Sequence, residues 1–153
     1  MCAGIGAGMP DSTLYFEDVE MGDEVGPIER SVTTDQVREF VQVWGAQSGP
    51  SRFTDPAVAK AEGLPGAILP GAMSLALMSQ IVTGWSTSVV LRKLDVVFRQ
   101  TVPHNAALKL QGIVTDKGVV DGRPQLECDV LMEDAEGTRL VIGKATVTLP
   151  TRG

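Results

Sequence analysis

Residues Gly71–Thr83 read GAMSLALMSQIVT and contain no charged side chain. Apolar or small residues occupy nearly every position, with a few uncharged polar residues between them. Because the apolar side chains surround nearly the whole circumference, the pattern predicts a helix that is buried on every side. Such a helix requires other elements of the fold to wrap it.

Downstream of this helix, the spacing of apolar residues changes to alternation, which is typical of strands with one buried face. Asp121-Gly122 and Glu136-Gly137 are typical of hairpin turns between such strands. The sequence therefore predicts four strands joined by hairpins, one of them over residues 108–115. The residues expected on the buried faces of the other three are Val90, Leu94, Val96 and Phe98; Leu126, Cys128, Val130 and Met132; and Val141, Ala145, Val147 and Leu149.

The first half of the chain predicts one strand and two further helices. Ile28–Thr33 is expected to form the strand. Thr33, with Gln36 three residues later, resembles a capping box and is followed by apolar residues at helical spacing. Asp55-Pro56 supplies an N-cap and a proline at the first helical position, which predicts a short helix that ends at Gly63.

This order of elements predicts an α+β fold in which a curved antiparallel sheet wraps around a long central apolar helix, the hotdog architecture. A curved sheet is the available partner for so apolar a helix. No repeat or linker divides the chain, so we expect a single domain over residues 13–153. Residues 1–12 are expected to be a flexible tail, because they lack the basic residues and the long apolar run of a signal peptide.

The composition narrows the class of partner. Nineteen acidic residues against thirteen basic ones give a net charge of -6, with no basic cluster, which argues against a nucleic-acid partner. The apolar runs are too short and too polar for a membrane span, so a cytoplasmic protein is expected. Cys2 and Cys128 predict free thiols rather than a disulfide framework. The single histidine, His104, has no cysteine nearby, so no metal site or cofactor is expected.

Four segments resemble, in order, those of the MaoC-like family, which includes (R)-specific enoyl-CoA hydratases and 3-hydroxyacyl-ACP dehydratases. The family patterns are F-A-x-x-S-G, A-K-x-x-G-(F/L), I-A-H-G-M and V-x-F-x-x-P-V. The resemblance implies a hotdog domain that handles acyl thioesters in fatty acid or polyketide metabolism. The matching segments are FVQVWG at 40–45, AKAEGL at 59–64, ILPGAM at 68–73 and LDVVFRQTV at 94–102.

The two catalytic residues of that family are missing from their expected places. In the family, a loop aspartate and a histidine five positions later handle the water and the α-proton of the acyl thioester, since hydration needs an acid and a base near one C=C bond. Alignment on the preceding helix places Ala46 and Ser51 at these positions. Alignment on the following helix places Ser48 and Phe53 there. The resemblance therefore implies the ligand class and leaves the chemistry open.

The segment that matches the catalytic loop holds the first group of candidate site residues. Gln47, Ser48, Ser51 and Arg52 are either ordinary solvated loop residues or contacts to an altered substrate. Arg52 is the most informative of them, because a guanidinium can clamp a carboxylate or phosphate with two hydrogen bonds. His104 lies in a turn, where a histidine is more often a surface residue than a catalytic one.

The central helix and the strand after it hold the second group. Gly71 matches the family glycine, and with Ala72 it would offer backbone N–H groups at the positive end of the helix to a thioester carbonyl. Alternatively, Gly71 only permits close packing. Arg92, Lys93 and Arg99 would meet the phosphates of a CoA or phosphopantetheine arm, or would simply form a solvated strand face.

These residues support two hypotheses from different classes. In the first, the chain is an acyl-thioester-binding MaoC-like protein that hydrates or dehydrates its ligand through non-standard residues. In the second, it is a non-catalytic subunit that pairs with a related chain carrying the aspartate and histidine. A homodimer or a heterodimer is expected, because a second hotdog chain can cover the edge strand.

A thioesterase is a less favoured alternative. Proteins that resemble the hotdog thioesterases generally carry a carboxylate on the central helix, and this carboxylate activates a water molecule. The stretch Gly71–Thr83 has no carboxylate, so Ser74 or Gln80 would have to hold the water.

Overall fold

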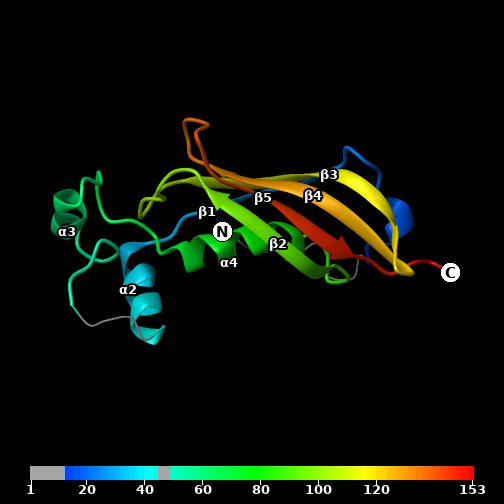
Figure 1. Cartoon of the computed structure of the whole chain (residues 1–153), viewed down its shortest axis with the longest axis horizontal. Helices are drawn as coiled ribbons and strands as arrows, with labels where there is room; N and C mark the ends of the chain where they lie inside the picture. Colours follow the sequence, from blue (N-terminus) through cyan, green and yellow to red (C-terminus); the bar gives the residue numbers. More distant parts are fainter. Residues whose placement is uncertain (1–12, 45–48) are drawn as a thin grey trace.

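The computed structural model describes residues 13–44 and 49–153 of the chain. It contains one sheet with a long helix beneath it and two shorter helices at one end (Figure 1). The predicted tail at 1–12 lies outside the described residues. The elements are η1 (Phe16–Asp18), β1 (Glu24–Arg30), α2 (Thr34–Val43), α3 (Pro56–Ala61), α4 (Gly71–Thr83), β2 (Val90–Phe98), β3 (Leu108–Val120), β4 (Arg123–Glu133) and β5 (Arg139–Thr148).

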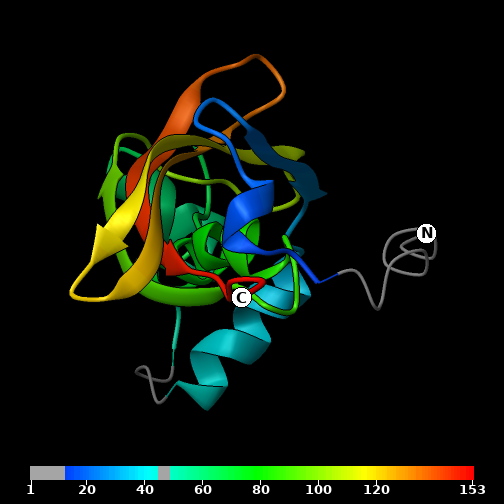
Figure 2. The same ribbon diagram turned by 90° about the vertical axis from the view of Figure 1, so that its right-hand side faces the viewer.

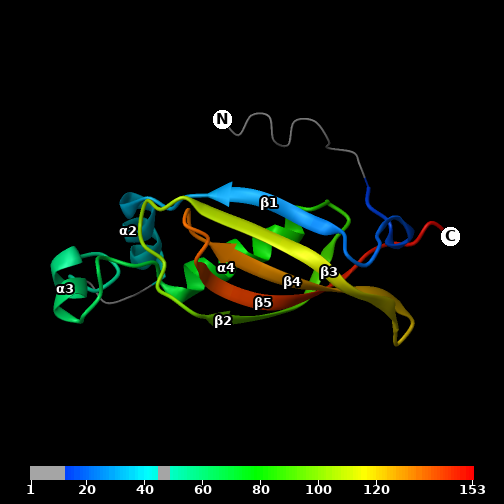
Figure 3. The same cartoon turned by 90° about the horizontal axis from the view of Figure 1, so that it is seen from above.

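The five strands form one antiparallel sheet in the order β1-β3-β4-β5-β2, as the view from above shows (Figure 3). The predicted hairpins from β3 to β4 and from β4 to β5 are confirmed. Asp121 and Gly122 both have positive φ, 51° and 78°, as a type I′ turn requires. The predicted hairpin between β2 and β3 is wrong, because β2 pairs with β5 at one edge and β3 lies beside β1. Alternation predicts which face of a strand is buried, but it does not identify the neighbouring strand.

The starts of β1 and β2 also differ from the prediction. Strand β1 begins at Glu24 rather than at Ile28. A bulge between Leu91 and Lys93 shifts the pairing of β2 with β5. Leu91 therefore packs against the core, and Val90, expected on the buried face, is 48% exposed. Past the bulge, Leu94 and Val96 pack against the core as predicted.

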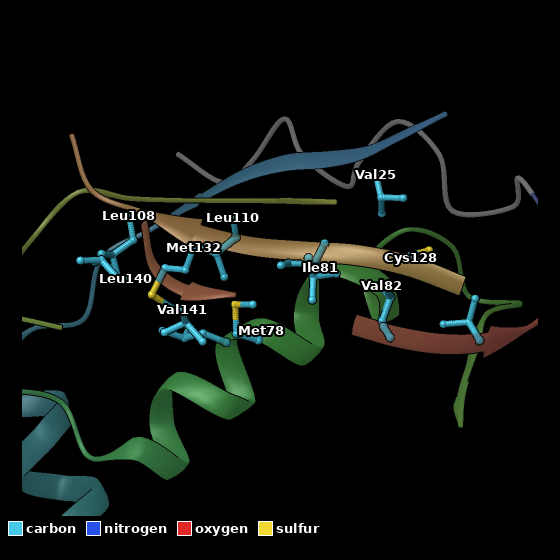
Figure 4. Packing of buried hydrophobic residues seen from close by; sticks show 14 of the residues in the cluster. Val25, Met78, Ile81, Val82, Leu108, Leu110, Cys128, Met132, Leu140 and Val141 are labelled. Atoms are coloured by element: carbon cyan, nitrogen blue, oxygen red, sulfur yellow. The ribbon is translucent and has the colours of Figure 1, made fainter. Parts of the chain in front are cut away.

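Helix α4 has the predicted bounds and lies along the concave face of the sheet, which curves around it when the molecule is viewed from the end (Figure 2). The helix contacts all five strands. Its buried side chains follow a helical stripe, and Met78, Ile81 and Val82 point into the cluster formed by the strands (Figure 4). The prediction of burial on every side is wrong, because Leu75 is 41% exposed on the side of the helix that the sheet does not cover.

Close approach between β5 and β2 depends on a glycine. A Cβ atom at Gly143 would overlap the carbonyl oxygen of Asp95 on the neighbouring strand. Only a residue without a side chain fits there, which lets the two strands pair closely where the sheet bends around α4.

The two short helices begin as the sequence predicts. The Thr33 hydroxyl accepts a hydrogen bond from the Gln36 N–H at 3.1 Å, and the Gln36 side chain accepts one from the Thr33 N–H at 2.9 Å. Asp55 caps α3 by accepting from the Ala57 N–H at 2.8 Å, with Pro56 in the first turn. Both helices lie near the end of the sheet at which α4 begins (Figures 1 and 3).

The structure also bears on the predictions about the cysteines and about membrane-spanning helices. Cys128 is a free buried thiol, and burial raises its pKa to about 11. Cys2 lies outside the described residues. None of the helices in the described part of the chain is both long and apolar enough to cross a lipid bilayer.

Candidate functional site

A cavity of about 570 Å³ opens at the N-terminal end of α4. This volume lies in the range of small-molecule sites, roughly 300–1,000 Å³. Four segments meet there: the loop before α3, the turns between α3 and α4, the first turn of α4, and the end of β2 with the residues after it. The lining residues are Arg52, Phe53, Leu64, Pro65, Ile68, Leu69, Gly71, Ser74, Phe98, Arg99, Gln100, Thr101 and Val102.

The start of α4 presents backbone donors at this cavity. The helix begins after Pro70, whose carbonyl accepts hydrogen bonds from the N–H groups of Met73 and Ser74 at 3.0 and 3.3 Å. Within the described ranges, the N–H groups of Gly71 and Ala72 have no partner, as is usual for the first residues of a helix. Gly71 lines the cavity, so the positive end of the helix dipole is directed at any ligand there.

Phe98 forms the wall opposite the helix start. A Cβ atom built at Gly71 would lie 3.5 Å from the end of the Phe98 ring, an ordinary van der Waals contact. Phe98 is nevertheless 51% exposed, so the ring is packed on one side only. The uncovered side of the ring therefore remains available to an apolar part of a ligand in the cavity.

Of the four loop residues predicted to belong to the site, the structure describes two, and one of these lines the cavity. Gln47 and Ser48 lie outside the described residues. The Ser51 hydroxyl accepts from the Phe53 N–H at 3.2 Å, within the turn that precedes α3, and Ser51 does not line the cavity. Arg52 does line it, with its guanidinium 2.8 Å from a carboxylate oxygen of Glu62.

Phe53 occupies the position of the family histidine in the alignment on α3, and it lines the cavity. A benzyl side chain can neither accept nor donate a proton. The described lining residues include no carboxylate, imidazole or thiol, and their only ionisable side chains are Arg52 and Arg99. Arginine keeps its proton in proteins, so these walls offer no acid–base pair.

The single histidine is not among the lining residues, and it connects two segments of the chain. The His104 Nε2 lies 3.2 Å from the carbonyl oxygen of Ile68, and Nδ1 lies 3.1 Å from the hydroxyl of Thr34. A carbonyl can only accept, so Nε2 carries a hydrogen, and in the neutral ring Nδ1 accepts from Thr34. His104 thereby joins the start of α2 to the segment that leads into α4.

Only one of the three cations predicted to bind CoA reaches the cavity. Arg99 lines it and is exposed. Arg92 donates from Nε to the Thr148 hydroxyl at 3.2 Å, and Lys93 pairs with Asp95 at 3.2 Å. Neither of these two is among the lining residues.

Helix α4 also supplies Ser74, for which the sequence predicted only that it would hold a water in a thioesterase. Ser74 is 1% exposed and lines the cavity. Gln80, considered with it, is exposed and accepts a hydrogen bond from the Arg30 side chain at 3.0 Å. The sequence could have indicated Ser74, because it lies three residues after Gly71 and residues so spaced share one helix face.

A second hollow, of about 650 Å³, lies on the outer face of the sheet. Val97, Leu131 and Ile142 form its floor, and the Asp129–Lys144 ion pair at 3.4 Å borders it. It has no helix terminus and no enclosed polar side chain. The smaller cavity at α4 is therefore the candidate site. Over the described residues, no three His, Cys, Asp or Glu side chains gather as metal ligands would.

The sequence matches the model of the MaoC like domain over residues 18–135, most of the chain. The chain belongs to the MaoC-like family. No curated protein matches it. Among solved structures, the (R)-hydratase from A. caviae involved in PHA biosynthesis is 18% identical, with a TM-score of 0.75 over 88% of this chain and 99% of that chain.

Two solved complexes from Mycobacterium tuberculosis are similar to this MaoC-like chain. The match in the ChsH1-ChsH2 complex is 14% identical, with a TM-score of 0.71 over 86% of this chain and 98% of that chain. The match in the C-terminally truncated HadBC (3R-hydroxyacyl-ACP dehydratase) complex is 15% identical, with a TM-score of 0.65 over 84% of this chain and 96% of that chain. At these identities the likeness shows the hotdog fold alone.

Proposed function

We propose that this MaoC-like chain binds an acyl thioester in the cavity at the start of α4 and is the non-catalytic member of a hotdog pair. The observation that carries the proposal is the lining of the cavity. It combines apolar walls and a free helix terminus with the absence, among the described lining residues, of any side chain able to take up a proton at neutral pH.

The binding half of the proposal rests on Gly71 and the walls around it. A thioester carbonyl placed at the Gly71 N–H would be polarised by the helix dipole, and Ala72 offers a second N–H close by. The acyl chain would lie between Phe98 and the apolar side chains of the opposite wall. Arg99, at the cavity, is the cation suited to a phosphate of CoA or of a phosphopantetheine arm.

The pairing half rests on uncovered apolar surface. Strand β2 is at one edge of the sheet, where its outward backbone groups can pair with another strand. Val90 and Val97 on this strand are 48% and 52% exposed, and Leu75 on α4 is 41% exposed. Two of the similar structures are the ChsH1-ChsH2 and HadBC complexes, which supports a heterodimer over a homodimer as the working assembly.

Direct hydration by non-standard residues and thioester hydrolysis both find less support. Hydration would need Gln47, Ser48, Ser51 or Arg52 to move protons, and of these the two described residues are a turn-forming serine and an arginine paired with Glu62. Hydrolysis would need a base for the attacking water, and α4 carries no carboxylate.

The first experiment is hydration of crotonyl-CoA and of a longer trans-2-enoyl-CoA by the purified protein alone, followed by loss of enoyl absorbance. We expect no turnover, together with a rise in melting temperature in the presence of either ligand, because a ligand that binds only the folded state stabilises it. Gly71→Leu, which places a side chain beside the Phe98 ring at the cavity, should abolish the rise, and circular dichroism of the variant checks that its fold is retained.

The second part adds a MaoC-like chain that has the intact Asp-x-Asn-Pro-x-His loop. The pair should hydrate faster than that chain alone, and Gly71→Leu should reduce the gain. Turnover by the protein alone would overturn the non-catalytic assignment and direct mutation to the four loop residues. Absence of stabilisation by any acyl-CoA would overturn the binding assignment.

A further inference from the structure

The outer face of the sheet, turned away from α4, carries apolar side chains where polar ones are expected. Figure 3 looks onto this face, and in the described part of the chain no helix lies across it. An antiparallel sheet with one face in water normally alternates apolar inward residues with polar outward ones. Val97 and Ile113 follow the opposite rule, because they are 52% and 42% exposed at the hollow of about 650 Å³ on this face.

The strand register places the apolar side chains of the hollow in a row. Val97 on β2 pairs with Ile142 on β5, and Ile142 pairs in turn with Leu131 on β4. All three residues line the hollow. Contiguous apolar surface that is bordered by charged residues is typical of a face that another molecule covers.

A second row on the same three strands is charged, and the sign alternates from strand to strand. Asp95 on β2 pairs with Lys144 on β5, which pairs with Asp129 on β4. The Lys144 ammonium lies 3.4 Å from the Asp129 carboxylate, and both side chains are more than half exposed. These two charges therefore remain accessible to a molecule that covers the hollow.

We propose that the hollow is the contact surface for a second copy of this chain, packed sheet against sheet. The two copies would be related by a two-fold axis that runs parallel to the strands, between β4 and β5. In such a contact the same surface patch of both copies takes part, so it must be complementary to itself. The proposal does not depend on the acyl-thioester site, and it leaves the edge of β2 free for a related chain.

The two rows of the hollow meet this requirement when the axis lies between β4 and β5. Lys144 of each copy then faces Asp129 of the other copy, which gives two ion pairs across the contact. In the adjacent row, Leu131 of each copy faces Ile142 of the other, so that apolar side chains cover one another. Two sheets that pack face to face bury their facing apolar side chains in this way.

The alternation of charge also excludes the neighbouring position of the axis. An axis through β5 would place Lys144 against Lys144, and Asp95 against Asp129 of the other copy. Like charges that face each other across an interface cost several kcal/mol. The charges therefore select one register, as they do in specific interfaces generally.

The test is the self-association of the full chain, measured by analytical ultracentrifugation at low salt. Lys144→Asp and Asp129→Lys, taken singly, should each weaken the association about tenfold or more, because four like charges then meet at the contact. An equimolar mixture of the two variants should restore it. Each contact in the mixture joins a copy with two positive charges to a copy with two negative charges.

Two further variants complete the experiment. Arg38→Asp makes the same change in net charge at an exposed ion pair of α2, outside the hollow, and should leave the association unchanged. Leu131→Thr keeps a strand-forming residue but removes an apolar contact, and it should weaken the association. Circular dichroism of every variant checks that the fold is retained.

The outcomes separate this proposal from the pairing through β2. A monomeric wild-type chain, or an association that neither charge variant changes, would overturn the proposal and leave the hollow to a small ligand or to a different protein. Two weakened variants whose mixture does not associate would also overturn it, because the contact would not be reciprocal. Pairing with a related chain through β2 should survive Lys144→Asp and Asp129→Lys, since neither residue lies on that strand.

Discussion

The two halves of helix α4 differ in how completely the fold covers them. In the C-terminal half, Met78 and Val82 have no exposed surface and Ile81 has 2%. In the N-terminal half, Gly71 is exposed, and Ser74, although itself buried, lines a cavity. One helix of nearly uniform composition thus forms core at one end and the wall of a candidate ligand site at the other.

The difference shows that composition and packing are separate properties of this helix. The sheet curls over the C-terminal half, where side chains from the strands meet Met78 and Ile81 (Figure 4). At the N-terminal end, the turns before α4 and the ring of Phe98, the last residue of β2, line an open cavity. Stability should therefore reside in one half and ligand recognition in the other.

The largest effect is expected at the packed half. Met78→Ala should lower the free energy of unfolding by about 2–5 kcal/mol, because it leaves a cavity among fully buried side chains. The matched control, Leu75→Ala on the exposed side of the same helix, should cost about 1 kcal/mol or less. Urea denaturation followed by circular dichroism measures both, and equal losses would contradict the contrast between the two halves of α4.

An intermediate effect is expected at His104, whose polar contacts connect the start of α2 to the segment before α4. His104→Gln disrupts the link from Thr34 to the Ile68 carbonyl and should cost about 1–2 kcal/mol, since a partly buried carbonyl loses its donor. Thr34→Val removes one of the two contacts. A double-mutant cycle of the two changes should show coupling of about 0.5 kcal/mol or more, and strictly additive losses would exclude the connection.

The smallest effect is expected outside α4, at Asp18. A hydrogen bond from the Tyr15 N–H, then the Arg152 guanidinium, lowers the pKa of Asp18 from its ordinary value of 3.8. A carboxylate with a lowered pKa in the folded state stabilises the fold above its unfolded pKa, and this stabilisation is lost as the pH falls.

The measurement for this group is the melting temperature of wild type and Asp18→Asn at several pH values. Wild type should be slightly the more stable protein at pH 7, and the gap should close as the pH falls below about 4. A gap that stays constant down to pH 2 would show that the charge of Asp18 contributes nothing. Added salt should narrow the gap at pH 7, because the groups are exposed.

Much of the candidate site could be located from the sequence, because its parts are local. Gly71 was found from its place in a family segment, and the helix start follows from the residues around it. The position of Ser74 at the cavity could not be predicted, since an apolar pattern on all sides of a helix does not show which side faces a cavity. The ion pair of Arg52 with Glu62 joins residues on either side of α3, which the sequence pattern did not indicate.

The sequence by itself determined the bounds of α4, the caps of α2 and α3 and the hairpin turns on either side of β4. These depend on interactions between residues a few positions apart. Only the tertiary structure decided that β2 pairs with β5, that His104 joins Thr34 to Ile68, and that Phe53, Phe98 and Ser74 share one cavity. Those outcomes depend on contacts between residues distant in the chain, whose free energies arise only once the sheet has closed around the helix.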